Sequence, residues 1–134
     1  MSFIEWTDEL SIGIKEIDEQ HKNLLELANS LCKKIELDNH DMVQKAFDIF
    51  ITQSNIHYKE EEDLMTKHHY PRSDSHIGEH NELLQKVKGV SYLCSVNDQT
   101  VISSLTTILS DYFKHHFHGA DKSFAIYLNS RGVT

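Results

Sequence analysis

Residues that commonly bind transition metals recur along this chain at spacings that predict a shared site inside a helical bundle. They form the groups His21, His57-x-x-x-Glu61, His76-x-x-x-His80 and His116-x-x-x-x-Asp121. Residues four apart on an α-helix lie about 40° apart around its axis, so each i,i+4 pair directs two donors into the same space. Five histidines and two carboxylates are too many donors for one zinc ion and suit two adjacent metal ions that share carboxylates. The pattern therefore predicts a dinuclear metal centre.

The apolar pattern predicts the bundle that would bring these donors together. Apolar residues recur at helical spacing over about 19–37, 41–67, 74–94 and 98–118, and a last short helix is predicted over about 120–129. Residues 1–18 have no sustained period and contain Gly13, which predicts an extended arm. With 134 residues, 39% of them hydrophobic, the chain is large enough for one helical domain spanning 1–134 and too small for two. The predicted fold is all-α: an up-down-up-down four-helix bundle with an N-terminal arm and a short C-terminal helix.

Chain direction predicts that the donors converge at one end of this bundle. They lie early in the first and third predicted helices and late in the second and fourth. Because consecutive helices of such a bundle run in opposite directions, these positions meet at the same level. Every donor except Asp121 also continues the apolar seam of its helix, the side that faces the bundle interior.

Asp121 does not fit a regular helix. It follows His116 by five residues, which amount to about 500° of rotation and leave the two side chains some 140° apart on an α-helix. They can share a site only where the helix breaks, so irregular backbone is predicted at Gly119-Ala120. An unbroken helix through Gly119 would remove Asp121 from the set of ligands.

Exposed helix faces offer a competing interpretation of some of these residues. The acidic run Glu60–Asp63 resembles a charged surface, yet within it only Glu61 falls on the seam with His57. His115 competes with its neighbour His116, and helical phase favours His116. The other histidines are predicted to be exposed at turns or off the seams: His40, His68, His69 and His118.

Charge and composition disfavour several classes of function. A formal net charge of -8 without a basic patch disfavours binding to nucleic acids and to anionic membranes. The N-terminus lacks the features of a signal peptide, and no stretch approaches the ~20 apolar residues of a membrane span, so a cytoplasmic location is expected. Cys32 and Cys94 lie among apolar residues and are expected as free thiols in the core.

At this point the ordered motifs resemble the hemerythrin family, specifically its single-domain bacteriohemerythrins. The resemblance spans nearly the whole chain and includes the spacing of five between His116 and Asp121. It is carried by Trp6, by Ile17–Lys22, by His57–Met65, by Tyr70-Pro71 with the two histidines that follow, and by His116–Asp121.

The resemblance implies a non-haem di-iron centre, bridged by oxo or hydroxo oxygen, that binds O2 reversibly. One iron would be held by His76, His80 and His116. The other would be held by His21 and His57, and Glu61 with Asp121 would bridge the two. O2 would bind the iron with two histidines, where nitric oxide and small anions are further candidate ligands.

The walls of the O2 pocket are predicted to include Leu25, Ser54, Leu109 and Phe113. The chain departs from the family pattern at three aromatic positions. Tyr112 stands where tryptophan is frequent, Phe113 where a leucine commonly lines the pocket, and Phe117 where isoleucine is usual. A phenylalanine at 113 is therefore expected to alter the pocket.

The function expected from these patterns is non-enzymatic O2 binding, for transport, storage, delivery or buffering. Two alternatives remain: a module that senses O2 or nitric oxide through a separate partner, and a di-iron oxidase or ferroxidase. Ferritin-like di-iron bundles use a Glu-rich set with Glu-x-x-His pairs at i,i+3. This chain has i,i+4 pairs and a histidine majority, which argues against the oxidase.

Overall fold

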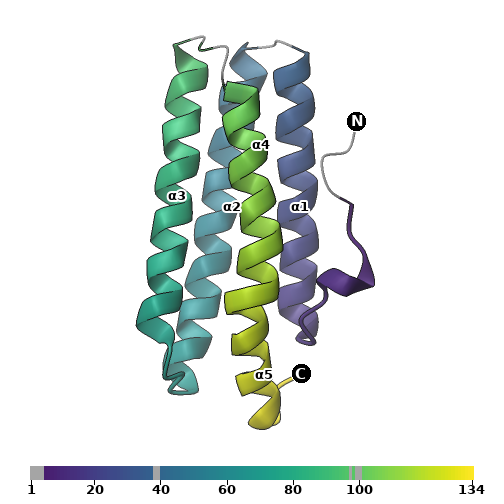
Figure 1. Ribbon diagram of the computed structural model, residues 1–134, viewed down its shortest axis with the longest axis vertical. Coiled ribbons are helices and arrows are strands. Elements are labelled where there is room, and N and C mark those ends of the chain that lie inside the picture. Colours follow the sequence, from purple (N-terminus) through teal and green to yellow (C-terminus); the bar gives the residue numbers. More distant parts are fainter. Residues whose placement is uncertain (1–4, 38–39, 97, 99–100) are drawn as a thin grey trace.

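The computed structural model describes residues 5–37, 40–96, 98 and 101–134 and confirms an all-α up-down-up-down bundle. Its helices are α1 (Lys15–Glu36), α2 (His40–Lys67), α3 (Ser73–Ser95) and α4 (Val101–Asp111), followed by a π-helix, η2 (Tyr112–Asp121), and α5 (Lys122–Ser130). Figure 1 shows α4, η2 and α5 as one continuous run that forms the fourth rod of the bundle. The predicted short last helix is therefore the end of this rod. No helix among the described residues is long and apolar enough to cross a membrane.

The N-terminal arm is shorter than predicted, because α1 begins at Lys15 and not near residue 19. Asp18 therefore lies in the first turn of α1. Its carboxylate accepts hydrogen bonds from the Ser11 hydroxyl at 2.5 Å and from the Ile12 backbone N–H at 2.9 Å. The arm, which carries the short 3-10 helix η1 (Asp8–Leu10), is thus fastened to the first turns of α1, beside which it runs in Figure 1.

The turns at the other end of the bundle are only partly described. Residues 38–39, between the first two predicted helices, lie outside the described residues, as do residues 97 and 99–100 near the predicted start of the fourth helix. Asp98 itself is not helical, so the fourth helix does not start there as predicted. In the described residues both cysteines are free thiols, with Cys94 buried and Cys32 half-buried, as expected.

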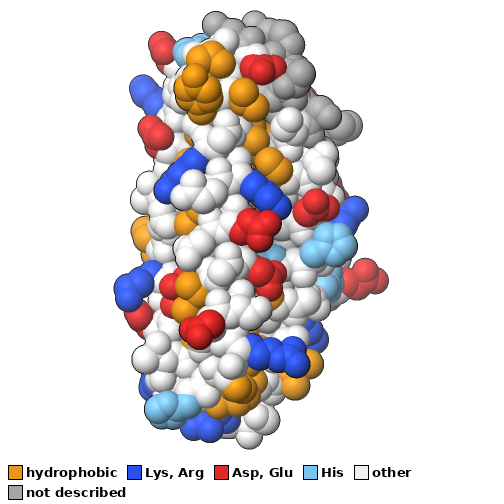
Figure 2. Space-filling model, turned by 60° about the vertical axis from the view of Figure 1, so that its left-hand side comes forward, with side chains coloured by type: hydrophobic (Ala, Val, Ile, Leu, Met, Phe, Trp, Pro, Cys, Tyr) orange, Lys and Arg blue, Asp and Glu red, His pale blue; other side chains and the backbone are white. Residues whose placement is uncertain are grey.

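Two apolar clusters fill the bundle, one on each side of the level at which the predicted donors lie. The larger cluster occupies most of the bundle length and includes Leu24, Phe50, Val87 and Phe113. The smaller one closes the end and joins the arm to the helix ends; its buried members are Ile12, Ile14, Ile17, Met65, Tyr70, Phe124, Ala125 and Leu128. Acidic and basic side chains are interspersed over the outer face shown in Figure 2. The charged sides of the helices therefore face outward. In the interior, the predicted donor side chains lie between the two apolar clusters.

Candidate metal centre

The structure brings all seven predicted donor side chains together in the bundle interior. None of them is more than 3% exposed. Their nitrogen and oxygen atoms fall into two groups, in each of which the donor atoms lie within 4.8 Å of one another. One group contains His76, His80 and His116 with both carboxylates, and the other contains His21 and His57 with both carboxylates. This is the same division that the resemblance implied.

The Asp121 carboxylate lies between the two groups. Its Oδ1 is 2.8 Å from His76 Nε2 and 3.1 Å from His116 Nε2. Its Oδ2 is 3.1 Å from His21 Nε2, on the other side. One oxygen therefore faces the three-histidine group and the other faces the two-histidine group.

The Glu61 carboxylate divides its oxygens in the same way. Its Oε1 is 3.2 Å from the Nε2 atoms of both His76 and His80. Its Oε2 is 2.6 Å from His57 Nε2 and 3.6 Å from His21 Nε2. Two carboxylates that each face both groups are placed to bridge a pair of ions.

The chemistry of these atoms fits a metal pair. The Nε2 atoms of all five histidines and the four oxygens of Glu61 and Asp121 are buried without a hydrogen-bond partner in the described structure. Leaving a buried polar atom unpaired costs about 1–3 kcal/mol, so nine such atoms at one place need a compensating partner. Neighbouring ligands of an octahedral ion at about 2.1 Å lie roughly 3 Å apart, which is the separation seen between these donors. The cluster is therefore compatible with di-iron binding.

A widening of the helix, and not a break, brings Asp121 to His116. Residues Tyr112–Asp121 form the π-helix η2, in which hydrogen bonds link residues five apart, so positions 116 and 121 face the same side on successive turns. The predicted irregular backbone is confirmed, but the expectation that the chain must break at Gly119 is wrong. Gly119 has no left-handed φ, and a Cβ added there would meet nothing within 4 Å. The neighbouring His115 is 81% exposed, which leaves His116 as the inward histidine.

Three side chains that the sequence did not single out contact the outer ring nitrogens of three of the five histidines. His57 Nδ1 lies 2.5 Å from Gln20 Oε1, His80 Nδ1 3.1 Å from Glu62 Oε2, and His116 Nδ1 3.2 Å from Glu79 Oε1. An acceptor on Nδ1 favours the tautomer that leaves the Nε2 lone pair free for a metal and fixes the ring orientation. Each of the three is adjacent in sequence to a predicted donor. Each contact, however, joins two different helices, so it cannot be predicted from residue spacing within one helix.

Aromatic rings pack against the donors on the side of the larger apolar cluster. Phe117 stacks on His21 with ring centroids 3.6 Å apart, and Tyr58 stacks on His80 at 3.9 Å. The four residues predicted to line an O2 pocket, Leu25, Ser54, Leu109 and Phe113, are all buried. Three of them belong to this cluster, and the fourth, Ser54, has a buried hydroxyl without a hydrogen-bond partner. Their role as pocket walls stays a prediction.

Several of the clustered side chains have pKa values far from their usual range. Burial lowers the pKa of His21 and His76, but the Asp121 and Glu61 carboxylates outweigh it and raise both pKa values to about 9. Burial likewise opposes ionisation of the two carboxyl groups, yet the surrounding histidines hold the pKa of each below its usual range. The carboxylates are therefore ionised at neutral pH and ready to bind cations.

Comparison with known proteins agrees with this geometry. The profile of the hemerythrin HHE cation binding domain matches residues 12–127. A bacteriohemerythrin of Stenotrophomonas maltophilia is 27% identical over 93% of this chain and 81% of its own length, and one of Clostridium acetobutylicum is 26% identical over 89% and 96%.

Solved structures show the same fold. Crystal structures of hemerythrin variants with one leucine replaced by alanine or by tyrosine superpose with a TM-score of 0.85 at 24% identity, covering 96% of this chain and 98% of theirs. Because the profile match covers most of the bundle and the fold agrees, the resemblance seen in the motifs is confirmed. The chain belongs to the hemerythrin family.

Proposed function

We propose that this protein binds O2 reversibly at a di-iron centre and does not consume it. The observation that supports this most strongly is the unequal division of donors. Glu61 and Asp121 face both groups, so one group offers five protein donors and the other four. An ion that prefers six ligands is less saturated in the four-donor group, which holds His21 and His57. When bound there, the iron pair would supply the electrons and the open coordination position that O2 needs.

The surroundings of the four-donor group favour binding over turnover. Phe117 covers the face of His21, and both apolar clusters flank the donor level. Dry surroundings slow the loss of reduced oxygen species and the side reactions that water permits. His57, His80 and His116 are hydrogen-bonded at their outer ring nitrogens. His21 stacks on Phe117, so four of the five histidine rings have a contact that fixes their orientation.

Phe113 is our candidate for the residue that sets the size of the pocket. Its ring packs edge-to-face on Phe117 at 5.1 Å, and Phe117 in turn stacks on His21. Phe113 is thus one ring removed from a donor of the two-histidine group. Phe113→Leu is expected to change the O2 association and dissociation rates and the autoxidation rate. Unchanged rates would remove Phe113 from the pocket.

The central experiment loads the metal-free protein anaerobically with Fe²⁺ and records its visible spectrum before air, after air and after removal of O2. We expect two irons per chain and a charge-transfer band that appears with O2 and disappears without it. Irreversible bleaching, or steady consumption of O2 by the reduced protein, would instead support an oxidase or ferroxidase. Within the proposed class, the role is storage, delivery or buffering. A protein captured only in the presence of O2 or nitric oxide would favour sensing.

A further inference from the structure

The burial of the donors raises the question of how cations reach them. No donor is more than 3% exposed, so an ion must pass between surface side chains before it meets a ligand. One surface pocket of about 230 Å³ reaches Glu61, another of about 200 Å³ reaches His76, and another of about 170 Å³ reaches His57. Each is a candidate path, and their linings differ in charge.

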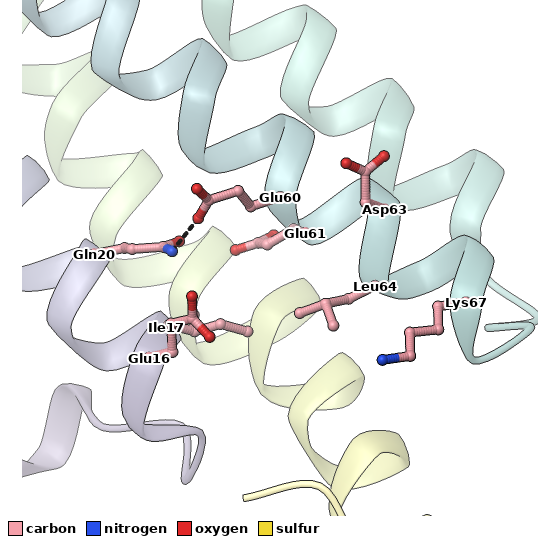
Figure 3. Close-up of a pocket in the computed structure, with 8 residues that line it drawn as sticks. All are labelled: Glu16, Ile17, Gln20, Glu60, Glu61, Asp63, Leu64 and Lys67. Atoms are coloured by element: carbon pink, nitrogen blue, oxygen red, sulfur yellow. Dashed lines mark hydrogen bonds between the residues drawn. The ribbon is translucent and has the colours of Figure 1, made fainter.

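The pocket that reaches Glu61 lies between α1 and α2 (Figure 3). Glu16, Ile17 and Gln20 line it from α1, and Glu60, Glu61, Asp63, Leu64 and Lys67 line it from α2. Glu61 is only 1% exposed, and both of its carboxylate oxygens lack a hydrogen-bond partner. The pocket therefore ends on a buried carboxylate that has no hydrogen-bond partner and belongs to the candidate centre.

Its lining is the most acidic of the three. Besides Glu61 it contains Glu16, Glu60 and Asp63, against the single cation Lys67. In the pocket that reaches His76, Arg72 offsets Glu79, and the pocket that reaches His57 contains one acid, Glu60, among neutral side chains. A concave surface lined by one sign of charge concentrates ions of the opposite sign and speeds their association. Of these paths, the one to Glu61 is the best suited to cations.

We propose that this pocket is the entry path by which divalent cations load the metal centre, with Glu16 and Asp63 attracting the hydrated ion and Glu61 as its first buried ligand. The inference rests on the proposed di-metal site. It assigns Glu16 and Asp63 a role that neither has in the finished centre, since neither belongs to the two donor groups. The apolar Ile17 and Leu64 lie in the same lining, so carboxylate oxygens have to replace water as the ion moves inward.

Glu16 is the sharpest position at which to test this path. Asp63 already pairs with Lys59 at 3.0 Å, and Glu60 accepts a hydrogen bond from Gln20, which holds His57. Changing either of those acids would alter a second interaction. Lys67, at the same pocket, offers a change of the opposite sign.

The experiment mixes metal-free protein with Co²⁺, and separately with Fe²⁺ under anaerobic conditions, and follows the loading rate by stopped-flow absorbance. At low ionic strength Glu16→Gln is expected to slow loading about two- to threefold, and Lys67→Gln to accelerate it by a similar factor. Both effects should fade near 1 M salt, where the screening length is about 3 Å. The final ratio of two ions per chain and the final spectrum should not change.

Glu26→Gln is the matched control. Glu26 is an exposed acid on the same helix, ten residues from Glu16 and so about 15 Å along the axis. Glu26→Gln should load metal at the same rate as the wild type. Equal rates for wild type, Glu16→Gln and Lys67→Gln would overturn the entry path, as would equal slowing by Glu26→Gln, which would mean a general effect of net charge. Failure of the wild type itself to bind two ions would instead refute the proposed centre.

Discussion

Gly119→Ala tests whether the widened helix η2 depends on a glycine. Gly119 is exposed, has no left-handed φ, and an added Cβ would meet nothing within 4 Å. Alanine should therefore fit without strain and should stabilise the helical backbone, where glycine costs about 0.5–1 kcal/mol relative to alanine. Unfolding entropy is about 2.1 cal/mol/K per residue, so for 134 residues this gain raises Tm by about 2–4 °C. The geometry between His116 and Asp121 should persist.

The assay is thermal unfolding of the metal-free protein by circular dichroism, followed by measurement of metal stoichiometry. Gly89→Ala is the matched control, because Gly89 is an exposed glycine in the regular helix α3 with equally open space around it. Equal gains at 119 and 89 are expected. Gly13→Ala should instead destabilise, since Gly13 has φ +87° and its Cβ would lie 3.3 Å from Asn129 Nδ2. A lower Tm or the loss of bound metal in Gly119→Ala would show that η2 does require glycine at position 119.

Three further outcomes follow from the contacts around the centre. Glu79→Gln should lower metal affinity about 10- to 100-fold in chelator competition, because Glu79 contacts Nδ1 of His116. Glu82→Gln, on the exposed side of α3, should leave the affinity unchanged. Equal affinities of the two variants would show that the contact between Glu79 and His116 is dispensable. Ser54→Ala should raise the free energy of unfolding in urea by roughly 1 kcal/mol, because it removes a buried hydroxyl without a partner; a loss would reveal a bond to that hydroxyl. The metal-free protein should lose stability as pH rises through about 9, because His21 and His76 have folded-state pKa values near 9, above the unfolded value of 6.5, and their contribution is complete only below 6.5. A melting temperature that is flat between pH 7 and 10 would contradict this.

The helix register could be predicted from the sequence because it depends on local geometry. On a helix, the angle between two side chains follows from their spacing alone, so the inward direction of His57 with Glu61 and of His76 with His80 needed no tertiary information. The level at which the helices meet followed from chain direction in an antiparallel bundle. The spacing of five between His116 and Asp121 likewise predicted an irregular backbone, but it did not predict that the backbone forms a π-helix.

What could not be predicted depends on contacts between segments. α1 begins at Lys15 and not near residue 19, and Asp18 in its first turn binds the arm through Ser11 and Ile12. A π-helix is one of several ways to accommodate a spacing of five, and the spacing alone does not distinguish a widened helix from a broken one.

The sequence by itself therefore determined which seven side chains meet in the bundle interior, the helices that carry them and their common level. The tertiary structure alone decided which carboxylate oxygen faces which histidine group, and that Gln20, Glu62 and Glu79 hold the outer ring nitrogens. It also decided that an acidic pocket between α1 and α2 ends on Glu61. The physical reason is that helical phase is a property of one backbone, whereas the rotation and separation of neighbouring helices are set by how their side chains pack.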